Sequence, residues 1–314
     1  MNLTLEQANK VDDIISEFFE KVDRKGRIAS RLRRAIDKSA KYLRPKVNEW
    51  LEIMRSRIIR DMLKRYVRKT GGPGSYRVIS DGAERKALAP LQKDRALDIT
   101  TKLTDWKWIE QRGNSILKPA ILTVVENGAN EALIIGGIEA RFDILNPKSV
   151  AWAQKHCATL VREVTNETRK GIKNIIRRGI KEGFAMPKIA RKIRPLVGLT
   201  SRQMMAVANH EEWLITNRPE LSAKEIERRI DVYARRKHRR RADMIARTES
   251  AYAVDEGTLE GYEEAEVEMV EWLTSQAGAC DDCIAQSGRK FKIKEAHGMQ
   301  PAHPICRCCW SPVI

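Results

Sequence analysis

The chain lacks a hydrophobic run long enough to cross a membrane. Its longest apolar stretches lie at residues 121–125 and 132–138, whereas a membrane-spanning helix needs about 20 apolar residues. The first residues also lack a basic segment followed by an apolar core, so no secretory signal is expected. We therefore expect a soluble product of a reducing cytoplasm, with no membrane partner in its soluble state.

Cysteine is nearly absent from most of the chain. Five of the six cysteines crowd into the last segment, and Cys157 lies far from them. Because Cys157 falls on the apolar stripe of an expected helix, we interpret it as a small buried hydrophobe and not as a nucleophile. A cysteine cluster in a reducing compartment indicates a metal site before a disulfide framework.

Acidic residues are too few to balance the basic ones. The chain has 59 Lys and Arg against 42 Asp and Glu, which gives a formal net charge of +17. A positive field of this size attracts nucleic acid, acidic protein surfaces or anionic membranes. The alternative is a helix-rich surface with many solvated Lys and Arg side chains, and charge alone does not decide between the two.

Apolar residues at helical spacing dominate the chain. Thr4 and Gln7 form a capping box that predicts a first helix, which Gly26 would end. Pro45 is expected to break or kink the helical stretch that follows. The glycine-rich stretch 70–75 cannot continue a helix, so it marks a linker.

Two further long helices are indicated in the central region. Asn146 caps and Pro147 opens a long amphipathic helix, and Gly183 is a good terminator for it. Ser222 and Glu225 form a second capping box, which starts another long helix.

These patterns predict a mainly α protein with a small C-terminal zinc-stapled β-hairpin module, an α+β arrangement. Residues 266–274 are rich in β-forming side chains and alternate in part, which predicts a strand, and residues 290–293 supply a short partner after a turn. The expected domains are a helical N-terminal arm (1–69), a linker and helical region (70–127), a helical central region (128–265) and the zinc-binding β-hairpin module (266–314).

The last segment carries two clusters of soft metal ligands. Cys280 and Cys283 can bind one ion from a tight turn. After nineteen intervening residues the chain supplies His303, Cys306 and Cys308. Tetrahedral zinc needs four ligands. Our first choice takes both cysteines of the first cluster with His303 and Cys306, and Cys308 remains a substitute for either of these two.

Zinc is favoured over free or disulfide-linked cysteines because both clusters have ligand spacing. Four soft ligands leave no position for a water molecule, so the ion is expected to be structural, with no catalytic residue and no enzymatic activity. Cys309 is expected to be a bystander, since adjacent residues of an extended segment point to opposite sides. The sequence therefore predicts about one structural zinc per chain.

In their order and spacing, several pieces of the chain resemble the phage head morphogenesis family, the Mu protein F-like minor head proteins. The resemblance covers roughly Gly128 to the C-terminus, and the first hundred or so residues carry no assignable motif. The chain departs from the family pattern at residues 211–241, which are longer and more basic than the family's usual link into the signature helix. The pieces are Gly136-Gly137-Ile138, Phe142-Asp143, Asn146-Pro147, the signature helix Ile245-Ala246-Arg247-Thr248-Glu249, Trp272, Cys280-x-x-Cys283, Gly288 before Phe291, and His303-Pro304-x-Cys306-Arg307-Cys308.

The resemblance implies a non-enzymatic minor capsid protein of the virion. It places the protein in the head interior or at the portal vertex, and in the host cytoplasm before assembly. It implies the phage portal protein and capsid or scaffold proteins as partners. Contact with genomic double-stranded DNA, or help in its delivery, stays open as an additional role.

The signature helix holds two charged candidate residues, Arg247 and Glu249. They lie two positions apart and cannot face one side of a helix, so they do not form a simple local pair. Each is expected either to bond a neighbouring element, such as the zinc hairpin, or to lie on a plain helix surface.

The densest positive charge lies at residues 235–241. Such a run suits non-specific contact with DNA phosphates. The alternatives are a solvated helix and a contact with an acidic portal surface. The candidate nucleic-acid-binding residues are Arg235, Arg236, Lys237, Arg239, Arg240 and Arg241.

A zinc site is also found in two other functional classes. A zinc-dependent nucleic-acid enzyme, such as a nuclease or deaminase, needs an open metal position beside an acid or base. His210-Glu211-Glu212 spells the deaminase His-x-Glu, but Ala279 stands where that signature has proline. A zinc-containing DNA-binding regulator needs a reading helix between its ligand pairs, and residues 284–302 hold two glycines and a proline that disfavour one.

Overall fold

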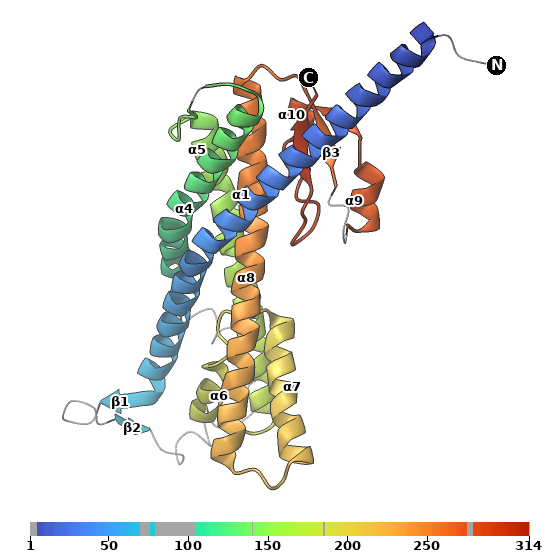
Figure 1. Cartoon of the computed structure of the whole chain (residues 1–314). Helices are drawn as coiled ribbons and strands as arrows, with labels where there is room; N and C mark the ends of the chain where they lie inside the picture. The colour runs from blue at the N-terminus through green and yellow to red at the C-terminus, as the bar shows by residue number, and fades with distance from the viewer. Residues whose placement is uncertain are drawn as a thin grey trace. The chain divides into compact units, whose positions relative to one another are not determined.

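A computed structural model of the chain describes residues 5–69, 76–78, 104–139, 141–184, 186–274 and 279–313. Its helices are α1 (Leu5–Tyr66), α4 (Trp106–Ile135), α5 (Pro147–Lys181), α6 (Met186–Ile193), α7 (Ser201–Asn217), α8 (Ala223–Glu264), α9 (Asp281–Gln286) and α10 (Ile293–Ala296). Its strands are β1 (Val67–Lys69), β2 (Tyr76–Val78), β3 (Met269–Leu273), β4 (Lys290–Lys292) and β5 (Cys309–Pro312). The prediction of a mainly α protein with a small C-terminal sheet is confirmed (Figure 1).

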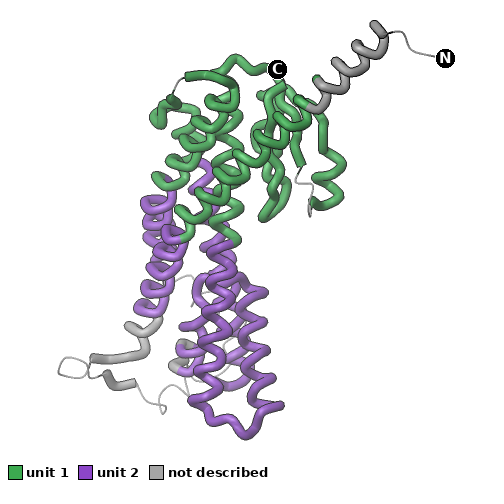
Figure 2. The backbone as a smooth tube through the Cα atoms, viewed as in Figure 1, with its two compact units in different colours: residues 1–44, 119–153, 244–314 green, residues 45–118, 154–243 purple. Residues whose placement is uncertain are grey.

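The chain forms two compact units (Figure 2). One combines residues 1–44, 119–153 and 244–314, and the other combines residues 45–118 and 154–243. Helices α1, α4, α5 and α8 contribute residues to both units. The domain boundaries expected from the sequence remain predictions.

Local capping signals set the ends of the two long central helices. The side chain of Asn146 accepts a hydrogen bond from the backbone N–H of Lys148 at 2.9 Å, and α5 begins at Pro147. Ser222 accepts one from the backbone N–H of Glu225 at 3.2 Å, and α8 follows. Both helix starts predicted from the sequence are confirmed.

Helix α1 is longer than the sequence predicted. It continues through Gly26, so the expected end there was wrong, and it continues through Pro45, so of the two expected effects of this proline the break was wrong. Leu32, Leu43 and Val47 are each at most 1% exposed. Burial of these side chains offsets the cost of a helical glycine, about 1 kcal/mol, and of a helical proline, about 3 kcal/mol. The capping box at Thr4 and the linker at 70–75 lie outside the described residues.

The C-terminal sheet has three strands in the order β4-β3-β5, with both pairs antiparallel. The predicted β3–β4 hairpin is confirmed, and Val270 pairs with Phe291. Strand β5 was missed because its four residues are all buried and show no alternation of polar and apolar side chains. It pairs Trp310 with Trp272 on β3.

The sheet packs on the last turns of α8. Trp272 and Trp310 are buried, their ring centroids lie 5.3 Å apart, and the rings meet edge to face. Leu259 and Tyr262 of α8 belong to the same apolar cluster. This cluster fixes the strands from which the cysteine-bearing segments extend.

Small residues let α4 and α8 approach closely. A Cβ atom at Gly261 of α8 would lie 2.6 Å from the backbone oxygen of Ala129 on α4. Gly128 and Gly257 likewise face the backbone of the other helix. The two helices therefore pack backbone to backbone, and α8 gives the C-terminal module a rigid support.

Candidate metal centre

Two short segments carry the candidate metal ligands. Cys280 is the N-cap residue of α9, and Cys283 lies in the first turn of that helix. His303, Cys306 and Cys308 follow α10, in the segment that leads into β5. Because β4 and β5 both pair with β3, the sheet brings the segments that precede these two strands together.

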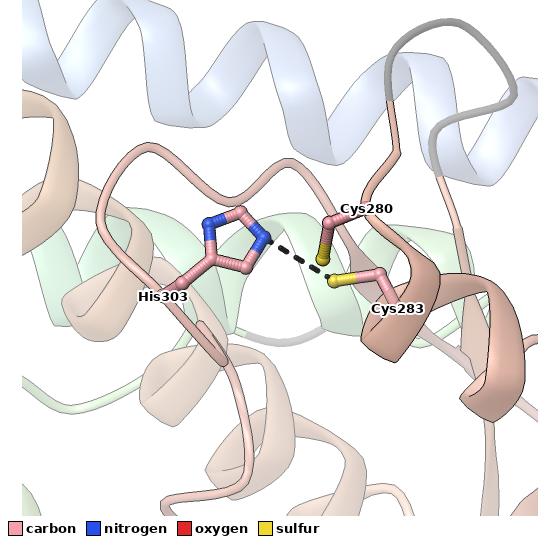
Figure 3. Close-up of side chains that lie close together, drawn as sticks. All are labelled: Cys280, Cys283 and His303. Carbon is pink, nitrogen blue, oxygen red and sulfur yellow. Dashed lines mark hydrogen bonds between the residues drawn. The ribbon is translucent and has the colours of Figure 1, made fainter.

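The ligand atoms have separations suited to one tetrahedral ion. The Sγ of Cys283 lies 3.4 Å from the Nε2 of His303 (Figure 3) and 3.7 Å from the Sγ of Cys306. Zinc–ligand bonds of about 2.3 Å to sulfur and about 2.0–2.1 Å to nitrogen give tetrahedral edges of about 3.8 Å (S–S) and about 3.6 Å (S–N). Both observed separations fall near these edges.

The five candidate ligands form two overlapping groups. Cys280, Cys283 and His303 make one group, and Cys283, Cys306 and Cys308 make the other, with ligand atoms within 4.8 Å of one another in each. Cys283 therefore belongs to both. A single tetrahedral ion would take four of the five residues.

The neighbouring cysteine lies elsewhere. Cys309 is in neither ligand group and packs against Ile28, Ala29 and Leu32 of α1. Its side chain turns away from that of Cys308, as expected along an extended segment. Burial raises the pKa of the Cys309 thiol to about 12, which favours the neutral form.

The surroundings tune the thiols of the site in different directions. A hydrogen bond from the backbone of Cys283 lowers the pKa of Cys280. A hydrogen bond from the Cys308 side chain lowers the pKa of Cys306 to about 5, whereas burial raises that of Cys283 to about 12. The lowered pKa values shift Cys280 and Cys306 toward the thiolate form, which is the form that binds metal.

The chemistry of these donors fits zinc. Thiolates with an imidazole suit zinc, whereas calcium and magnesium prefer oxygen ligands. Asp281 and Asp282 are exposed in the first turn of α9 and belong to neither ligand group. An ion held by four of the five residues has no position left for a water molecule.

The signature helix contacts the second ligand segment. The backbone N–H of Ile305 donates to the hydroxyl of Thr248 at 3.4 Å. Ile305 has a φ of 65°, a region that β-branched residues avoid, so this bond helps to hold a strained loop. Arg247 is exposed and Glu249 is 8% exposed. The sequence singled out these two charged residues and missed Thr248 between them.

Asp255 is a second residue that the sequence gave no reason to select. It lies on α8, is 3% exposed, and its Oδ2 has no hydrogen-bond partner among the described residues. Burial raises the pKa of its carboxyl well above the usual range, and the nearby Cys306 raises it further. The protonated form is therefore favoured beside the ligand segment.

An ion-pair network ties the module to α8. The Nδ1 of His297 lies 3.1 Å from the carboxylate of Glu256, and its Nε2 lies 3.5 Å from that of Glu263. The hydrogen bond to Glu256 is the main cause of the raised pKa of His297. Lys148 at the start of α5 also pairs with Glu263, at 2.8 Å.

The basic run lies on α8, and only part of it is open to solvent. Lys237 is half-buried, with its ammonium 5.0 Å from the ring centroid of Tyr233. Arg241 is 3% exposed, and burial lowers its pKa to about 10, so this candidate does not belong to the exposed set. Burial also lowers the pKa of His238 to about 4, which keeps it neutral. The exposed members are Arg235, Arg236, Arg239 and Arg240.

The residues that resemble a deaminase motif have local partners. The ring of His210 lies 4.6 Å from that of Tyr233 and stacks on Trp213 at 6.0 Å. Glu211 pairs with Lys192 at 2.6 Å. Neither residue joins a metal-ligand group among the residues that the structure describes.

Comparisons with known proteins point to one family. A family model described as Phage Mu protein F like protein matches residues 170–311. The matched segment contains the signature helix and all five candidate ligands, so the resemblance inferred from the sequence is confirmed there. Comparison with curated proteins and with solved structures returned no match. Within the described residues, the helices contain no apolar stretch long enough for a membrane span.

Proposed function

We propose, from the match of residues 170–311 to the Phage Mu protein F like family, that this chain is a structural minor head protein of a tailed phage. The family match supports a phage head-related protein. Our proposal adds association with the portal during head morphogenesis, a location in the head interior or at the portal vertex, and capsid or scaffold proteins as partners. The family match is the observation that carries it.

The proposal includes one structural zinc ion in the C-terminal module. The tetrahedral separations around Cys283 and the soft donor set support it. Such an ion would staple the segment before β4 to the segment before β5. Its role would be to hold this surface rigid, without a catalytic step.

DNA contact is a further part of the proposal. Four exposed arginines on α8 offer cations that can approach phosphates. Contacts of this kind fix position without reading sequence. They suit a protein packaged beside a genome.

Mass spectrometry of purified virions tests the head role. We expect peptides of this chain in gradient-purified particles, at a small molar fraction of the major capsid protein. We also expect the chain to remain with the portal when particles are disassembled. Its absence from particles that contain the portal would reject the proposal.

A further inference from the structure

A large groove is lined only by residues of the unit formed by residues 45–118 and 154–243, the unit coloured purple in Figure 2. Helices α1, α5, α6, α7 and α8 all contribute to its walls. Its volume is about 1810 Å³, roughly twice the upper end of small-molecule pockets, about 1,000 Å³. The groove is therefore sized for a polypeptide segment and exceeds what a metabolite needs.

The floor of the groove is apolar. Phe184 and the partly exposed Ile226 line the groove together with buried aliphatic side chains, and Ile215, which also lines it, is 55% exposed. An apolar row along a groove is the surface that an amphipathic helix covers. The buried aliphatic residues are Ile175, Ile189, Leu196, Val207 and Ile230.

The rim of the groove carries an excess of uncompensated positive charge. Four of its acidic residues are paired with neighbouring cations: Glu52 with Arg55, Glu182 and Glu212 with Arg178, and Glu211 with Lys192. Five rim cations have no carboxylate partner among the described residues. Only two rim acids, Glu227 and Asp231, have no cationic partner among them. The five cations are Arg60, Lys188, Arg191, Arg194 and Arg235.

We propose that this groove binds an acidic amphipathic helix of a partner protein. Its apolar stripe would cover the aliphatic floor, and its carboxylates would meet the rim cations that have no carboxylate partner, of which Lys188 lies over the ring of Phe184. An apolar floor argues for a protein segment over nucleic acid, because a phosphate backbone gains nothing from aliphatic side chains. The inference goes beyond the proposed virion role and does not depend on it.

The test uses the full chain and two labelled peptides of eighteen residues, measured by fluorescence anisotropy. One peptide is a Leu/Glu helix with leucines at helical spacing, and the other is a scrambled version of the same composition. We expect the amphipathic peptide to bind at least about tenfold more tightly than the scrambled one. Binding of the amphipathic peptide should weaken about tenfold in the double variant Arg191→Gln with Arg194→Gln. It should weaken by a similar factor in the single variant Ile215→Ser.

Matched controls lie outside the groove. Arg162→Gln removes an exposed arginine and Ile284→Ser an exposed isoleucine, and both should leave peptide binding unchanged. Circular dichroism of every variant checks the fold. The proposal would be overturned if the two peptides bound equally well or if neither bound measurably. It would also be overturned if the groove variants bound the amphipathic peptide as tightly as the parent. A 20-base-pair duplex that binds tightly and depends on Arg191 and Arg194 would also overturn it and reassign the groove to nucleic acid.

Discussion

Among the described residues, Cys283 alone belongs to both candidate ligand groups, so its loss breaks both of them. We expect Cys283→Ser to reduce the zinc content of the purified chain from about one equivalent to near zero and to unfold the C-terminal module, because structural zinc contributes folding energy directly. Elemental analysis and thermal unfolding measure both effects. Asp281→Asn, in the same helical turn, is the matched control and should behave like the parent. Retention of a full zinc equivalent by Cys283→Ser would contradict the assignment.

His297 makes the stability of the module depend on pH. Its pKa is raised by Glu256 and Glu263 in the folded state. The stabilisation is therefore complete below the unfolded pKa of about 6.5 and is lost as the pH rises through the raised folded pKa. Because the pair is partly exposed, its contribution to the free energy of unfolding is roughly 1 kcal/mol.

Comparison of His297→Gln with the parent isolates this effect from the pH dependence of metal binding. The parent should exceed the variant in unfolding free energy at pH 5.5, and the difference should shrink at pH 9. Urea unfolding at the two pH values, in the presence of zinc, measures it. A difference that grows with pH would show that the histidine is not held as a cation.

The sequence located the candidate metal ligands but could not choose four of the five. Spacing was sufficient to find both cysteine clusters, because paired ligands must lie close along the chain. It could not choose among His303, Cys306 and Cys308, since the choice depends on side-chain directions in a folded loop. Thr248 and Asp255 were missed because they approach that loop only through tertiary contacts from α8.

The close contact between α4 and α8 gives a paired test at the level of elements. Gly261→Ala places a methyl group 2.6 Å from the backbone oxygen of Ala129, so one helix must move. We expect a loss of about 1–3 kcal/mol in unfolding free energy. Gly26→Ala is the control: nothing lies within 4 Å of its new Cβ, and it should gain about 0.5–1 kcal/mol. Urea denaturation distinguishes the two, and equal effects would contradict the close packing.

Helix starts could be predicted, whereas helix continuity could not. Asn146 and Ser222 act through hydrogen bonds to residues two or three positions away, so local sequence contains the whole signal. The passage of α1 through Gly26 and Pro45 depends on buried side chains that pack against distant elements. Strand β5 was missed for the same reason: burial at every position removes the alternation that marks a strand.

At the level of the whole molecule, the family match and the resemblance differ in extent. The match begins at residue 170, so the pieces from Gly136 to Pro147 lie outside it. The ordered C-terminal motifs were sufficient to find the resemblance that the family match confirms over residues 170–311, because several weak patterns in one order are jointly specific. The first hundred or so residues carry no such pattern, which is why the sequence assigned them no role.

The net charge of +17 gives the whole molecule a positive field, but a field alone does not distinguish a DNA surface from a solvated one. The exposed arginines of α8 make the distinction testable. We expect duplex DNA binding that weakens steeply with salt, and Arg239→Gln with Arg240→Gln should reduce the slope of log K against log salt by about 1.8, because each phosphate contact contributes about 0.9. Lys155→Gln with Arg162→Gln removes two exposed cations of α5 and should leave the slope unchanged. Binding that ignores ionic strength, or equal slopes for the two double variants, would assign these arginines to solvent or to an acidic protein surface.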